Sequence, residues 1–217
     1  IIILIFNHPI PEYPWPNYTA FLFLTLSVLV FNENKKQNLF LSSFFLGLSI
    51  LCRENFYFFI IPTWLLLSLL IYIRYRNFLN FAYFILGLII PISFFLFFLV
   101  SNNIFDLWLN FQKLPFIYVD RYETTTIDLI ISFFSFFSND VIFNLVEKPQ
   151  YLAILIIYLF CLFVFFEEIF IRKFNKLKIV FICLLSLSSF IVSINYEIFR
   201  LYTSITFGLP IIFYRLN

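Results

Sequence analysis

The sequence contains no methionine, only three glycines and a single histidine, His8. Three glycines are too few for the backbone-amide loops that cradle nucleotide phosphates, and neither a nucleophile elbow nor an HExxH pattern occurs. The three cysteines are scattered through apolar sequence without the paired spacing of disulfides or metal sites. We therefore expect no metal and no cofactor, and we interpret the cysteines as small core residues.

Charge is also scarce, because charged residues make up 12% of the chain while apolar residues make up 63%. The mean hydropathy is +0.98. A soluble domain carries roughly 25% charged and 45–50% apolar residues. A single water-facing core could not hide this much apolar surface, so lipid must form part of the solvent. The composition predicts an all-α, polytopic transmembrane helix bundle.

Seven apolar stretches are predicted to cross the membrane, because about 17–25 apolar residues span a bilayer as a helix. The chain also opens on an apolar run and has no methionine, so we expect a truncated span before these seven. Residues 1–217 would then form a single transmembrane domain that is truncated N-terminally and C-terminally. The predicted spans are residues 18–31, 39–51, 56–73, 78–100, 151–171, 177–194 and 199–214.

Three short loops, at residues 32–38, 74–77 and 172–178, are rich in lysine and arginine. Such loops concentrate on the cytoplasmic side of membrane proteins. With all three inside, the inner face carries nine cations and three acids, and the outer face carries five cations and nine acids. The long polar segments then fall on the outer face, where we expect any functional site.

This topology requires that residues 127–146 do not cross the membrane. Within them, polar side chains recur at spacings of four, three and four and form one stripe of a helix. The apolar run at residues 129–137 is too short for a core of about 30 Å. We predict an interfacial helix on the outer face over residues 128–139. A short, tilted crossing helix is the alternative.

Arg53 is the first candidate site residue. It follows a predicted helix, residues 39–52, that is only about 21 Å long at 1.5 Å per residue. Arg53 would then lie below the outer surface, where a charge costs several kcal/mol unless it is paired or in a wet cavity. Either Glu54 neutralises it at a hairpin tip, or Arg53 faces a cavity and holds a phosphate.

Two further outer segments carry candidate residues. The loop at residues 101–126 includes Arg121 and Tyr122 in a mixture of aromatic, cationic and acidic side chains. That mixture suits sugar and phosphate recognition, and it equally suits an ordinary solvated loop. Near the C-terminus, Tyr196 and Arg200 precede the last predicted span. Arg200 would face either a phosphate or the membrane interface, where long cationic side chains snorkel.

Residues 41–62, LSSFFLGLSILCRENFYFFIIP, resemble a recurring block of the C superfamily of membrane glycosyltransferases. In that block a helix with small residues ends in an arginine, and an apolar helix containing proline follows. Residues 13–26, YPWPNYTAFLFLTL, are similar to the segment before the block. Residues 195–210, NYEIFRLYTSITFGLP, are similar to a late segment of the outer face that contains arginine and tyrosine.

The resemblance implies an enzyme similar to the dolichyl-phosphate-mannose-protein mannosyltransferases, with a polyprenyl-phosphate sugar as donor and transfer at the outer or periplasmic face. It assigns Arg53 and Arg200 to the donor phosphate. The catalytic acid of the family usually lies in the first outer loop. We expect that loop to precede residue 1, so no catalytic residue is assigned.

We therefore expect part of an integral membrane glycosyltransferase, located in the bacterial inner membrane. Its expected partners are membrane lipid and a polyprenyl-phosphate sugar, and no nucleic acid. Two alternatives remain: a transporter or flippase for a glycolipid, and an enzyme similar to O-antigen polymerases, which also use arginines of the outer face. A transporter would be expected to show an internal repeat, and the sequence shows none.

Overall fold

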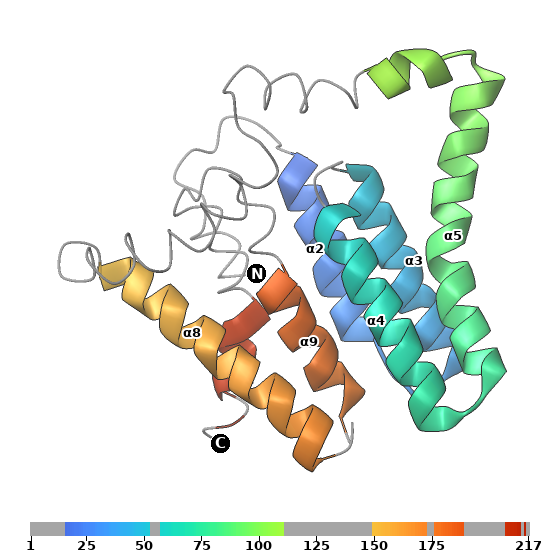
Figure 1. The fold of residues 1–217 in the computed structure, drawn as a ribbon. Coiled ribbons are helices and arrows are strands. Elements are labelled where there is room, and N and C mark those ends of the chain that lie inside the picture. The colour runs from blue at the N-terminus through green and yellow to red at the C-terminus, as the bar shows by residue number, and fades with distance from the viewer. Residues whose placement is uncertain are drawn as a thin grey trace.

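The computed structural model describes residues 16–52, 57–110, 149–172, 176–188, 207–213 and 215. Within these residues the chain is helical and contains no strand, which confirms the all-α class. Two shorter helical segments cover residues 105–110 and 207–213. The longer elements are α2 (Pro16–Val30), α3 (Lys36–Cys52), α4 (Tyr57–Tyr75), α5 (Phe78–Ser101), α8 (Pro149–Phe166), the π-helical turn η3 (Glu167–Ile171) and α9 (Leu177–Ser188) (Figure 1).

Asparagine side chains stabilise two short connections, the one between α2 and α3 and the one between α4 and α5. Asn77 precedes α5, and its side chain accepts a hydrogen bond of 2.9 Å from the Leu79 amide. Between α2 and α3, the Asn32 side chain accepts a bond of 3.0 Å from the Asn34 amide. Arg76 takes a left-handed conformation with φ of 46° and so ends α4. Arg76 and Asn77 thus set the end of α4 and the start of α5 between two apolar runs.

The helices form a bundle in which sequential neighbours run antiparallel (Figure 1). The two most extensive interfaces join α3 to α5 and α2 to α3. Further along the chain α8 packs on α9, and α9 packs on α4, which ties the C-terminal helices to the first four. The interfacial helix predicted at residues 128–139 lies outside the described residues.

Glycines allow α3 and α5 to approach closely. A Cβ atom added to Gly47 of α3 would lie 2.5 Å from Cγ of Pro91 in α5. A Cβ atom added to Gly87 of α5 would collide with the backbone oxygen of Phe40. Small residues at such crossings are typical of helices that pack within membranes.

Hydroxyl groups inside the bundle form hydrogen bonds between helices. Ser27 of α2 donates a bond of 2.7 Å to the carbonyl oxygen of Ser42 in α3, and both side chains are buried. Ser49 of α3 donates a bond of 2.9 Å to the carbonyl oxygen of Ala20. These bonds replace water as the partner of each buried hydroxyl. Other interhelical bonds join Trp64 to Ser43, Thr63 to Ser188 and Tyr158 to Leu187.

Among the described helices, α5 alone is long and apolar enough to cross a membrane by length and composition. Four shorter apolar helices accompany it, namely Thr19–Val30, Lys36–Cys52, Ile60–Tyr75 and Leu177–Ser188. The C-terminal half of α5 exposes large aromatic side chains, with Phe94 75% exposed and Phe97 70% exposed. The number of membrane spans remains a prediction.

Candidate functional site

Six residues were predicted from the sequence to form a site on the outer face. They all lie outside the described residues, although α3 ends at Cys52, the residue directly before the first of them. That end of α3 is opposite the connections between α2 and α3 and between α4 and α5 (Figure 1). The residues concerned are Arg53, Glu54, Arg121, Tyr122, Tyr196 and Arg200.

The polar groups that the structure does bring together lie at the basic end of the bundle. Glu33, in the connection between α2 and α3, pairs with Arg74 at the end of α4 at an O···N distance of 3.4 Å. Its other carboxylate oxygen accepts a hydrogen bond of 3.2 Å from the amide of Leu177, the first residue of α9. We call Glu33, Arg74 and Leu177 the Glu33 junction. It joins three parts of the chain that are distant in sequence.

Burial raises the pKa of the Glu33 carboxyl above its usual range. The Arg74 charge and the Leu177 amide oppose this effect, because both favour the ionised carboxylate, but desolvation is the larger cause. Arg74 also stacks its guanidinium 5.3 Å from the ring centre of Tyr75. The junction is thus a half-buried charge pair.

A second group of charges surrounds the π-helical turn. Glu168 is fully buried, and Glu167 is 16% exposed. Arg172 bonds Glu167 at 2.8 Å, and Arg215 bonds the other oxygen of Glu167 at 2.7 Å. Arg215 also lies 3.5 Å from Glu168. We call Glu167, Glu168, Arg172 and Arg215 the π-turn cluster, in which two cations balance two acids.

One acid from each group of charges, Glu33 from the junction and Glu168 from the π-turn cluster, caps the N-terminus of α9. The Lys176 amide donates a bond of 3.3 Å to Glu168, and the Leu177 amide donates to Glu33. The first amides of a helix lack partners within the helix, and their partial positive charge favours carboxylates. Sequence analysis assigned no role to these acids. The one signal in the sequence is that Glu33, Glu167 and Glu168 lie in or beside loops that are otherwise rich in lysine and arginine.

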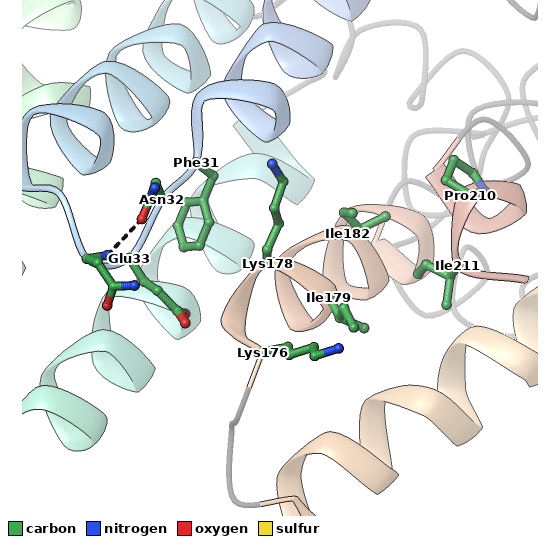
Figure 2. Close-up of a pocket in the computed structure, with 10 residues that line it drawn as sticks. Phe31, Asn32, Glu33, Lys176, Lys178, Ile179, Ile182, Pro210 and Ile211 are labelled. Carbon is green, nitrogen blue, oxygen red and sulfur yellow. Dashed lines mark hydrogen bonds between the residues drawn. The ribbon is translucent and has the colours of Figure 1, made fainter. Parts of the chain in front are cut away.

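A cavity of about 540 Å³ opens beside the Glu33 junction (Figure 2). Its polar side comes from the connection between α2 and α3 and from two lysines at the start of α9. Its apolar side comes from Phe31, from α9 and from the helical segment at residues 207–213. The lining residues are Phe31, Asn32, Glu33, Asn34, Lys176, Lys178, Ile179, Ile182, Pro210 and Ile211.

The cavity lies beside the basic loops, at the end of the bundle opposite Cys52, the last residue of α3. In the part of the chain that the structure describes, no three histidine, cysteine or acidic side chains gather to hold a metal ion. The cavity is lined by two lysines, two asparagines and the Glu33 carboxyl beside an apolar wall, a composition that suits an amphipathic ligand.

Neither a protein-family model, nor a curated protein, nor a solved structure matches this chain.

Proposed function

We propose that the chain is part of a polytopic membrane glycosyltransferase that takes a polyprenyl-phosphate sugar as donor at the face opposite the basic loops. The proposal has two parts, insertion of the bundle in a membrane and recognition of a lipid-linked phosphate. Each part has its own support and its own test.

Insertion in a membrane is supported by the distribution of side chains, because the bundle buries hydroxyl groups and exposes large apolar side chains. Its outward faces carry many large apolar side chains, such as Leu29 at 65% exposure and Phe163 at 64%. Water would penalise such a surface, whereas lipid is as apolar as these side chains. The buried hydroxyl groups belong to Ser27, Ser42, Ser43, Ser49, Thr63, Ser68 and Ser186.

Support for phosphate recognition comes from the sequence around the end of α3. This helix has 17 residues, or about 25 Å at 1.5 Å per residue, and is shorter than a bilayer core of about 30 Å. Its last residue, Cys52, is followed by Arg53, which the resemblance assigns to the donor phosphate. An arginine held near lipid depth is stabilised when it binds a phosphate through its planar fork.

Binding of polyprenyl phosphate, the product common to all such donors, tests the proposal without knowledge of the sugar. We expect Arg53→Ala to weaken binding to the full-length protein in detergent by roughly 10- to 100-fold, as for loss of a charged hydrogen bond. Arg53→Lys should not restore binding, because an ammonium group lacks the bidentate geometry. Arg76→Ala, an exposed arginine at the opposite end of the bundle, is the matched control.

The double variant Arg53→Ala/Glu54→Ala separates the two interpretations of Arg53. If removal of both side chains restores binding and folded yield, Arg53 only neutralises Glu54 and the phosphate role is wrong. If yield is normal and binding stays weak, the phosphate role stands. Extraction of the protein from membranes by alkaline carbonate would refute the membrane part separately.

A further inference from the structure

The cavity beside the Glu33 junction has the composition of a lipid-headgroup site. Two lysines line it: Lys176, which directly precedes α9 and is exposed, and Lys178 in the first turn of α9. Figure 2 shows the Lys178 side chain extending between Phe31 and Ile182. The Lys176 side chain points in a different direction, below Ile179, so the two lysines bring positive charge to different parts of one cavity.

Glu33, the acid that lines the cavity, has partners of its own in the junction. Glu33 is engaged by Arg74 at 3.4 Å and by the Leu177 amide at 3.2 Å, so its charge is already balanced within the junction. Lys178 donates one hydrogen bond of 3.2 Å, to the carbonyl oxygen of Leu29. An ammonium group has three donors, so Lys178 can also bind an anion.

An amide adds a neutral donor at the mouth of the cavity. The oxygen of the Asn32 side chain accepts a hydrogen bond of 3.0 Å from the Asn34 amide, as the dashed line in Figure 2 marks. The NH₂ group of Asn32 is then the end of this side chain that can donate to a ligand. Phosphate and glycerol ester oxygens are suitable acceptors.

The opposite wall of the cavity is hydrocarbon. Ile179, Ile182 and Ile211 line it, with Pro210 exposed at its edge. A small hydrophilic anion would gain nothing from such a wall, whereas the first methylene groups of an acyl chain would be shielded by it. The volume of about 540 Å³ lies within the usual range for a ligand site.

We propose that this cavity binds an anionic phospholipid of the leaflet on the side of the basic loops, with its phosphate at Lys178 and its upper acyl chains along Ile182 and Ile211, while Lys176 adds a second positive charge to the cavity. Basic pockets between membrane helices on the cytoplasmic side bind lipid headgroups of this kind. The inference rests on the membrane placement under the proposed function, and it is independent of the sugar-transfer chemistry at the opposite face.

Thermal unfolding of the full-length protein in mixed micelles tests the inference. Phosphatidylglycerol should raise the unfolding temperature more than phosphatidylcholine does, and native mass spectrometry should detect retained phosphatidylglycerol. Lys176→Gln/Lys178→Gln should weaken the apparent affinity for phosphatidylglycerol by roughly 30-fold, as expected for two cations near an anionic lipid. The matched control is Lys35→Gln/Lys36→Gln, which removes two exposed cations at the same end outside the cavity.

A third variant, Ile182→Trp, keeps both lysines and fills the cavity from its apolar wall. This variant should also weaken phosphatidylglycerol binding. Because it retains the bond from Lys178 to Leu29, it still tests the site if the lysine substitutions impair folding. If both double-lysine variants lost affinity for phosphatidylglycerol equally, the lipid would be held by diffuse charge attraction and the proposed site would be wrong. If inorganic phosphate or glycerol 3-phosphate raised the unfolding temperature as much as phosphatidylglycerol does, the ligand would be a soluble anion and not a lipid.

The outcomes also separate this inference from the proposed function. A protein that resists carbonate extraction but shows no preference for phosphatidylglycerol refutes the lipid site alone. A protein that carbonate extracts refutes the membrane placement, and with it the lipid site. Loss of polyprenyl phosphate binding in Arg53→Ala, with phosphatidylglycerol binding intact, supports two separate sites.

Discussion

Glu33 shows how a single side chain can hold three helices together. It lies between α2 and α3, pairs with Arg74 of α4 and caps Leu177 of α9. Such a half-buried carboxylate loses hydration, and each of its two partners restores part of that loss. The sequence places Glu33 among cations, but it cannot say which cation lies beside it or that a distant amide binds it.

The raised pKa of Glu33 predicts a pH dependence of stability. An acid whose pKa is higher in the folded than in the unfolded protein stabilises the fold below its ordinary pKa, and this contribution is lost as pH rises through the folded pKa. Glu33→Gln cannot ionise. We therefore expect the unfolding temperature of Glu33→Gln, relative to the unmodified protein, to increase as pH rises from about 4.5.

Thermal unfolding of both proteins in the same detergent, at pH values from 4 to 8, measures this difference. The glutamine keeps an acceptor for the Leu177 amide, so the comparison isolates the carboxyl proton. A difference that is constant across the range, or that falls with pH, would contradict the pKa shift.

At the level of helices, the crossing of α3 and α5 depends on two glycines that face each other's helix. Gly47 lies against Pro91 and Leu88, and Gly87 lies against the backbone of Phe40. At Gly87 the obstacle to a larger residue is a main-chain oxygen, which cannot rotate away as a side chain can.

Alanine substitutions should therefore destabilise the bundle unequally. We expect Gly87→Ala to lower the free energy of unfolding by about 1–3 kcal/mol, the usual cost of overpacking, and Gly47→Ala to cost no more than that. Ser93→Ala, at an exposed position of α5, should have little effect and serves as the control. Denaturant titration in detergent provides the measurement, and an equal loss for Ser93→Ala would argue against a specific crossing.

The helices themselves were predictable, because long apolar runs fix their approximate bounds. The run at residues 78–100 became α5, Phe78–Ser101, since Asn77 caps its start locally. The start of α9 is different, because its first amides bind Glu33 and Glu168 from elsewhere in the chain. No local pattern marks the π-helical turn, whose bond from the Arg172 amide to the Glu167 carbonyl skips one residue more than an α-helix does.

For the molecule as a whole, the charge pattern predicts an arrangement that the contacts support in part. The described parts of the three basic loops meet at one end of the bundle, through the pair of Glu33 with Arg74 and the bond from the Leu177 amide to Glu33. The candidate donor site at the other end remains a prediction, because Arg53 and Arg200 lie outside the described residues. The sequence thus indicates which end of the bundle carries the basic loops, but it does not give the geometry of the site.

Cysteine accessibility in intact cells tests this polarity. In a Cys52→Ser background, where the other two cysteines are buried, Lys36→Cys and Arg172→Cys should resist a reagent that cannot cross membranes. Ser101→Cys, exposed at the far end of α5, should react strongly. Strong labelling at Lys36→Cys with none at Ser101→Cys would reverse the topology and the proposed face of transfer.

The Glu33 junction also imposes an order of assembly during synthesis. Its charge pair requires only the chain up to Arg74, whereas its bond to Leu177 spans 144 positions and closes last. At about 5–20 residues per second, a ribosome adds the intervening hundred or so residues in roughly 5–20 s. During that interval the first four helices must persist without α9, and one oxygen of the Glu33 carboxylate lacks the Leu177 amide as its partner.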